Sequence, residues 1–242
     1  MHLFAGVGGG LLADRILGHT PVVAVEWEPY ACQVLRERAA DGWFPDLRVW
    51  EGDVRLFDPS EYTGKVDCIH AGFPCQDISV AGKQAGVSEG TRSGLYREVL
   101  RIANIVRPRY LFLENVAAIL SNGLGTVLRD LDAMGYDTRW LCIRASDVGA
   151  EHSRDRWFAL ATDTKNEHVQ KSKVVEKKKS NGKFGGTSCD VSRVRASEWS
   201  IHKPSMVRES HDVSNWVGVA KGLGNAQVPL QAAAAWRLLG GE

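Results

Sequence analysis

A cysteine directly follows a proline in the stretch HAGFPCQDIS, residues 70–79, at the end of an apolar run. A thiol in this position has three ordinary roles: it packs in the core, it binds a metal ion, or it acts as a nucleophile above a pocket. Free cysteine is most often a small buried hydrophobe. Cys75 therefore counts as a nucleophile only if its surroundings favour that role.

Further reactive side chains lie beside other apolar runs. Glu114 interrupts the run YLFLENV, where burial would raise the pKa of a carboxyl group and suit it to acid catalysis. Arg154 and Arg156 precede another run at a spacing of two, which points both toward one face of a strand, where they can bind carbonyl or phosphate oxygens. The plainer alternatives are a helix-capping carboxylate and a pair of surface salt bridges.

The glycine-rich stretch FAGVGGG at residues 4–10 predicts a close backbone approach to a ligand at the start of a helix. Its spacing differs from the dinucleotide pattern GxGxxG. Glu26 follows about twenty residues later, where an acidic side chain can hold a ribose diol. Trp27 beside it can stack on a base or fill an interface, and Asp53 adds another acceptor after the next apolar run.

Short apolar runs alternate with segments of helical spacing over the first 163 residues. This alternation predicts βαβ units around a largely parallel sheet, in which ligands bind at the carboxyl ends of the strands. The reactive side chains would then meet at one edge of the sheet. We expect strands at residues 2–6, 22–27, 47–53, 66–73, 110–116, 138–145 and 156–162, and helices within 29–40, 93–107, 125–135 and after Pro229.

The composition is that of an ordinary globular protein of 242 residues, with 44% hydrophobic and 24% charged residues and a net charge of +1. No apolar stretch is long enough to cross a membrane, and no signal peptide is visible. The five cysteines form no CxxC pair, so we expect neither a zinc site nor a disulfide framework. This cysteine pattern suits a reducing cytoplasm.

The ordered set FAGVGG, EW, GDV, GFPCQ, ENV, RDR and GNAQVP resembles the DNA (cytosine-5)-methyltransferases. The resemblance implies an α/β fold: a Rossmann-like mixed seven-stranded sheet flanked by helices, with one of the last two strands antiparallel and a small irregular target-recognition region. It divides the chain into a catalytic, S-adenosylmethionine-binding domain at 1–163, a short recognition region or linker at 164–213, and a segment at 214–242 that returns to the catalytic domain.

The resemblance also implies an activity: transfer of a methyl group from S-adenosylmethionine to C5 of a cytosine flipped out of duplex DNA. The product would be S-adenosylhomocysteine, and no metal is required. Cys75 would add to C6 of the base, and Glu114 would protonate N3. Arg154 and Arg156 would hold the O2 side of the base.

The same resemblance implies two sets of binding residues. Those for the cofactor are Phe4, Ala5, Gly6, Gly8, Gly9, Glu26, Trp27, Asp53, Val54, Gly72, Pro74, Asn225 and Ala226. Those for DNA are Gln76, Ser79, Lys83 and Arg92. We expect a monomeric cytoplasmic enzyme, from a restriction-modification system or a phage.

The chain departs from the family pattern in several places. His2 stands where the family usually has an acidic residue, and Glu151-His152 replaces its usual Pro-Gln. The recognition region is short, which leaves the DNA sequence it would read open. Two alternatives remain: cytosine methylation in RNA, although the Cys-Phe-Thr element of the tRNA-directed branch is missing, and a catalytically silent homologue that binds nucleic acid.

Overall fold

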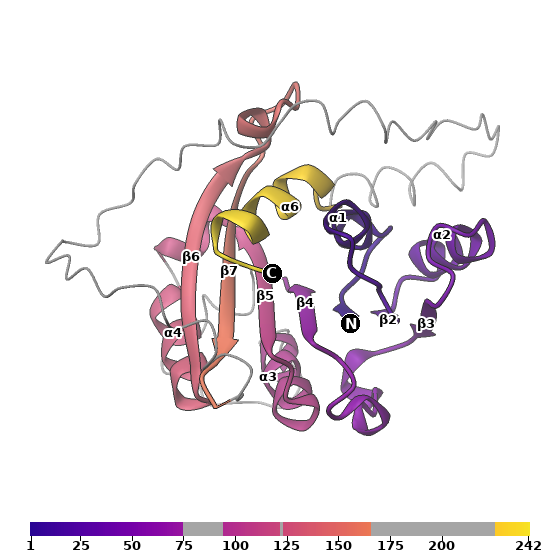
Figure 1. Cartoon of the computed structure of the whole chain (residues 1–242), viewed down its shortest axis with the longest axis horizontal. Helices are drawn as coiled ribbons and strands as arrows, with labels where there is room; N and C mark the ends of the chain where they lie inside the picture. Colours follow the sequence, from indigo (N-terminus) through magenta and orange to yellow (C-terminus); the bar gives the residue numbers. More distant parts are fainter. Residues whose placement is uncertain (75–93, 122, 166–225) are drawn as a thin grey trace, which may run out of the picture.

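The computed structural model describes residues 1–74, 94–121, 123–165 and 226–242 (Figure 1). Seven strands in these residues form one sheet in the order β3-β2-β1-β4-β5-β7-β6. β7 pairs antiparallel with both β5 and β6, whereas the other pairs are parallel. The predicted mixed sheet, with one antiparallel strand among the last two, is confirmed. The strands are β1 His2–Leu3, β2 Val23–Glu26, β3 Arg48–Glu51, β4 Cys68–Gly72, β5 Tyr110–Val116, β6 Tyr136–Arg144 and β7 Asp155–Asp163.

Helices cover both faces of this sheet (Figure 1). They are α1 Gly9–Leu17, α2 Pro29–Ala40, α3 Gly94–Val106, α4 Leu124–Ala133 and α6 Pro229–Leu238. Successive side chains of a strand point to opposite faces, and β5 shows the result: Leu111 packs in the core beneath α3 and α4, whereas Phe112 packs in the core beneath α6. The sheet is therefore buried on both sides, as a largely parallel sheet requires.

The first strand is shorter than the sequence predicts. It ends at Leu3 because Phe4 has a φ of 57°, in the left-handed region that bulky side chains rarely adopt. This turn leads the chain directly into the glycine-rich loop. Gly8 then caps α1 with a φ of 93°, which glycine adopts without strain.

The helix α6 lies beside α1 and packs against β6 and β7 (Figure 1). Every residue from Leu230 to Trp236 is buried, and the run of alanines lets the helix approach the sheet closely. Gln231 donates from Nε2 to the carbonyls of Ile143 at 2.7 Å and Arg154 at 2.8 Å. The end of the chain is thus tied to the β6–β7 region, while the domain boundaries at 163 and 214 stay predictions.

Among the described residues, no helix combines the length and apolar character that a membrane span needs.

Candidate active site

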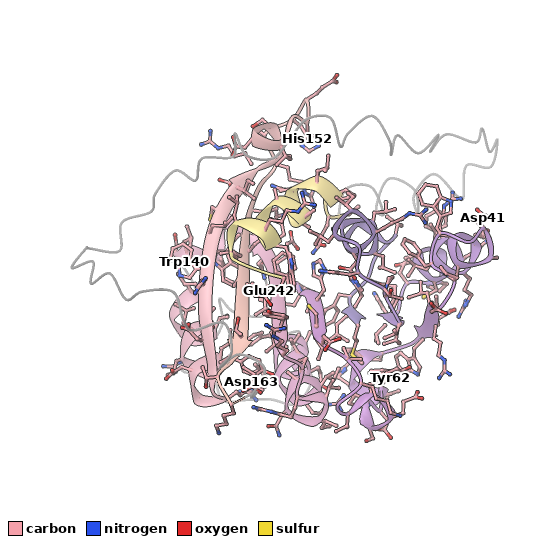
Figure 2. The ribbon with its side chains drawn as sticks, viewed as in Figure 1. Asp41, Tyr62, Trp140, His152, Asp163 and Glu242 are labelled. Carbon is pink, nitrogen blue, oxygen red and sulfur yellow. The ribbon has the colours of Figure 1, made fainter. Side chains whose placement is uncertain are left out.

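The carboxyl ends of the parallel strands meet at one edge of the sheet. Figure 2 marks the two ends of the sheet: His152, in the connection from β6 to β7, lies at this edge, and Asp163 lies at the opposite one. A pocket at this edge joins the glycine-rich loop to β4, β5 and the residues just before α6. It is lined by His2, Leu3, Phe4, Ala5, Gly6, Gly10, His70, Gly72, Glu114, Ala226 and Gln227.

A buried ion pair lies at the end of β5. Glu114 stands opposite Phe158 of β7, and Arg156 lies two residues before Phe158, so both side chains point to the same face of the sheet. The Nε atom of Arg156 is 2.9 Å from Oε1 of Glu114, with the side chains 17% and 11% exposed. Burial raises the pKa of Glu114, although the charge of Arg156 opposes this shift.

The second predicted arginine, Arg154, immediately precedes β7, so only Arg156 lies on the strand itself. The Arg154 carbonyl accepts hydrogen bonds from the Ala145 amide and from Gln231, which fixes its backbone. Its charge also favours the ionised form of Glu114, and burial, followed by the charge of Arg156, lowers the pKa of Arg154. The charges of two guanidinium groups therefore act on Glu114 at this edge of the sheet.

Glu26 holds the glycine-rich loop in place. Its side chain is buried at the end of β2 and accepts three backbone hydrogen bonds, from the amides of Gly6 at 2.7 Å, Trp27 at 2.9 Å and Glu28 at 2.9 Å. An ionised carboxylate has about four acceptor positions. Glu26 can therefore accept roughly one further hydrogen bond, such as one from a ribose hydroxyl, while it orders the loop.

Two more predicted cofactor residues follow neighbouring strands. Trp27 comes directly after β2 with a side chain that is 70% exposed, so it is not a core tryptophan. Asp53 follows β3 and caps the short 3-10 helix η1, Val54–Leu56, by accepting a hydrogen bond from the Arg55 amide at 3.0 Å. It also forms an ion pair with Arg55, whose hydrogen bonds lower the pKa of Asp53. An exposed ring and two carboxylates thus line consecutive strand ends.

The glycines of the loop allow a close approach to the chain itself. A Cβ atom on Gly9 would lie 2.3 Å from the Gln227 carbonyl oxygen, and one on Gly10 would lie 2.8 Å from Gln227 Oε1. Cβ atoms in proteins essentially never come within 3.0 Å of another heavy atom in this way. Gln227 therefore reaches the pocket only because these two positions have no side chain.

Several predicted site residues fall outside the described ranges. They are Cys75, Gln76, Ser79, Lys83, Arg92 and Asn225. Gly72 ends β4 opposite Glu114, and Pro74 is the last described residue before Cys75. The described chain thus leads into Cys75 from the strand next to Glu114.

Three residues with a role in this site were not predicted from the sequence. Asn115 donates from Nδ2 to the Phe73 carbonyl at 3.0 Å, which fixes the backbone two residues before Cys75. Arg101 of α3 donates to the carbonyls of Val54, the first residue of η1, and Phe57, the residue that follows it. Gln227 is the third. Asn115 and Gln227 lie within ENV and GNAQVP and could have been found there, whereas no pattern marks Arg101.

Comparison with known proteins gives consistent results. The Type II methyltransferase M.CviJI of Paramecium bursaria Chlorella virus IL3A is 38% identical over 164 residues, which are 66% of this chain and 42% of that protein. M.NgoMIV of Neisseria gonorrhoeae is 35% identical over 173 residues, 70% of this chain and 52% of that protein. The chain therefore spans about half or less of the length of these two relatives.

Among solved structures, a DNMT2 variant of Spodoptera frugiperda matches 69% of this chain and 50% of its own, with a TM-score of 0.54 and 21% identity. This likeness concerns the fold. The family model of C-5 cytosine-specific DNA methylases matches residues 1–215, which is most of the sequence and includes the glycine-rich loop, Cys75, Glu114 and both arginines. The chain belongs to the C-5 cytosine-specific DNA methylase family.

Proposed function

We propose that this chain methylates C5 of a cytosine that has been flipped out of duplex DNA. The observation that carries the proposal is the buried pair of Glu114 and Arg156, beside the strand that leads into Pro74 and Cys75. A buried carboxyl group with a raised pKa can protonate a ring nitrogen near neutral pH. Membership of the C-5 cytosine-specific DNA methylase family supports DNA as the substrate.

The residues at this edge of the sheet have the chemistry to bind S-adenosylmethionine. Glu26 has an acceptor position left for a ribose hydroxyl, the exposed ring of Trp27 can stack on adenine, and the backbone of the glycine-rich loop can approach the amino-acid end. When bound, the cofactor would supply an electrophilic methyl group. The proposed set of binding residues is completed by Asp53, Val54, Gly72, Pro74, Asn225 and Ala226.

The chain's own residues make the base reactive. The thiolate of Cys75 adds to C6 of cytosine, so that an S–C bond forms, the ring becomes an enamine and C5 becomes nucleophilic. Glu114 gives a proton to N3 as negative charge develops there, and the two arginines hold the O2 side. After methylation, a base such as a water molecule takes the C5 proton, the C6–S bond breaks to release the Cys75 thiolate, and N3 returns its proton to Glu114, which restores the ring.

The three cysteines within the described residues are poor nucleophiles. Burial raises the pKa of Cys32 and Cys142 to about 11 and that of Cys68 to about 12. Because only the thiolate attacks, these thiols are nearly unreactive at neutral pH. This favours Cys75, and we propose that the guanidinium groups of Arg154 and Arg156 lower the pKa of its thiol.

Duplex DNA would be held by Gln76, Ser79, Lys83 and Arg92, and the recognition region at 164–213 would choose the target sequence. We propose that the protein acts as a monomer in the cytoplasm. Cytosine in RNA remains the second candidate substrate, since the chemistry at the base would be the same.

A trapping experiment tests the mechanism. Duplex DNA with 5-fluorocytosine should form a stable covalent adduct in the presence of S-adenosylmethionine, because fluorine at C5 blocks the final elimination. The adduct should disappear in Cys75→Ser and persist in Cys189→Ser, the matched thiol control. An adduct that survives Cys75→Ser, or none across a pool of DNA sequences, would contradict the proposal. RNA in a parallel reaction distinguishes the two substrates.

A further inference from the structure

Gln227 lies where the glycine-rich loop, β4 and Glu114 meet. We propose that Gln227 is a positioning residue that holds Glu114 in both its charged and its neutral form, by turning its amide over when the carboxyl group gains a proton. The inference rests on the proposed function, in which Glu114 must change between these two forms.

Three glycines from two segments make room for Gln227: Gly9 for its backbone, and Gly10 and Gly72 for its side chain. Besides the contacts at Gly9 and Gly10, a Cβ atom on Gly72 would lie 3.0 Å from Gln227 Nε2 and 2.9 Å from Oε2 of Glu114. The amide therefore lies between Gly10 of α1 and Gly72 of β4, with its nitrogen toward Glu114. The fit leaves the side chain little freedom except rotation of the terminal amide.

Both oxygens of Glu114 face a donor. Oε1 is 2.9 Å from Nε of Arg156, and Oε2 accepts a long hydrogen bond of 3.4 Å from Gln227 Nε2. Because a guanidinium only donates, Oε1 must remain an acceptor, so a proton on Glu114 would lie on Oε2. The Gln227 nitrogen would then face a second donor. Half a turn of the amide brings its oxygen there instead, where it accepts the new O–H.

The far side of the amide permits this rotation. Gln227 Oε1 is buried and has no well-aligned hydrogen bond among the described residues, although the His70 ring lies close enough to interact with it. His70 Nε2 is likewise buried without such a bond. Burial lowers the pKa of His70 to about 3, so the ring is neutral and keeps an acceptor nitrogen. After the turn, the amide N–H group has a polar neighbour to donate to.

The charged and titratable groups around this site determine how the pKa of Glu114 would respond in a titration. Arg156 on β7 and Arg154 just before it face Glu114. Beyond Gln227 lie His70 on β4, His2 on β1 and Asp14 on α1, with His2 Nε2 2.6 Å from an Asp14 oxygen. Loss of the neutral Gln227 amide removes none of these charges, so the response of Glu114 can be assigned to the lost hydrogen bond.

The test uses Gln227→Met, which keeps the length of the side chain and removes its hydrogen bonds. Carboxyl-labelled NMR titration of the full chain should show a higher pKa for Glu114 than in the wild type, because the hydrogen bond of Gln227 to the charged carboxylate is stronger than the one to the neutral acid. The signal is assigned by Glu114→Gln. On duplex DNA, kcat should fall about tenfold, a part of what acid catalysis contributes, while KM for S-adenosylmethionine stays within about twofold. Gln33→Met, the same change on the exposed face of α2, should alter neither.

Unchanged pKa and kcat in Gln227→Met would overturn the proposal, as would a loss confined to cofactor affinity. Should that variant fail to fold, Gln227→Glu serves as the second test, because it keeps the size of a polar side chain. A second carboxyl group at this point should raise the pKa of Glu114. An unchanged pKa would contradict the contact between Gln227 and Glu114. The titration needs no turnover. If the pKa of Glu114 rises in Gln227→Met but the wild-type protein methylates no DNA, the proposed function is refuted and the role of Gln227 is retained.

Discussion

Arg156 and Glu114 face each other across an antiparallel strand pair, with Nε and Oε1 2.9 Å apart and both side chains mostly buried. The contact balances two opposing effects on Glu114: burial favours the neutral acid, and the guanidinium favours the carboxylate. A carboxyl group held in this balance can give up and regain a proton without a large change in free energy, which is what an acid catalyst needs.

Replacement of Glu114 by glutamine should remove the acid and keep the shape of the side chain. We expect kcat for DNA methylation to fall by about 10²–10⁴-fold, the usual contribution of a general acid, while circular dichroism shows a folded protein. Glu37→Gln, a change on the exposed face of α2, serves as the matched control. Activity of Glu114→Gln close to that of the wild type would show that Glu114 is not the acid.

His70 should make the protein sensitive to mild acid. Burial lowers its pKa from 6.5 to about 3, so between these values the unfolded chain binds a proton that the folded protein does not. Stability is therefore lost as the pH falls through this window, by up to about 1.4 kcal/mol per pH unit.

Urea unfolding of the wild type and of His70→Gln measures the effect. The range from pH 7 to 5 is chosen because it crosses the ordinary histidine pKa of 6.5, where the loss of stability begins. The free energy of unfolding should fall more steeply with decreasing pH in the wild type than in His70→Gln. His152→Gln, at an exposed histidine, should keep the slope of the wild type. Equal slopes in wild type and His70→Gln would mean that His70 is not held neutral.

Asn115 should matter for both stability and rate, because its amide fixes the strand end that leads into Cys75. Asn115→Ala leaves the buried Phe73 carbonyl without this donor, which should lower the free energy of unfolding by about 1–3 kcal/mol. The rate of adduct formation with 5-fluorocytosine DNA should fall as well. Asn104→Ala, on the exposed side of α3, provides the comparison; a loss of stability with an unchanged rate would limit Asn115 to a structural role.

Glu26 should determine cofactor affinity through the loop that it orders. In Glu26→Gln, an amide nitrogen replaces one carboxylate oxygen and faces backbone N–H donors, so the glycine-rich loop loses part of its support. Calorimetry with S-adenosylhomocysteine should show affinity reduced about tenfold, equal to about 1.4 kcal/mol. Glu37→Gln, at an exposed residue of α2 whose side chain accepts a hydrogen bond from Gln33, is the control. Unchanged affinity in Glu26→Gln would separate this residue from the cofactor.

The sheet and its polar edge could be predicted because they depend on local patterns. Apolar runs and helical spacing gave the element order, and in a largely parallel sheet the strand ends must share one edge. Glu26, Asp53 and Glu114 were found in this way, since each polar residue ends or interrupts an apolar run. The resemblance to a known family supplied the antiparallel strand and the roles of the residues.

The contacts between these residues could not be predicted, because each one depends on segments far apart in sequence. The pairing of Arg156 with Glu114 requires the register of β7 on β5, and Gln227 reaches the same carboxylate only through the gaps at Gly10 and Gly72. Phe4 is a third case: a phenylalanine predicts a longer strand, whereas the loop that follows imposes a left-handed turn. Tertiary structure overrides local preference at all three.

The packing of α6 has a consequence for how the protein is made. Phe112, Phe158 and Leu160 lie in the core that this helix covers, and Gln231 secures it there. A ribosome synthesises the sheet well before it reaches Pro229, so the nascent chain carries an uncovered apolar face until α6 emerges. Chaperone binding would protect this interval, and a message cut short before Pro229 would yield a product unable to bury that face, open to proteolysis rather than partly active.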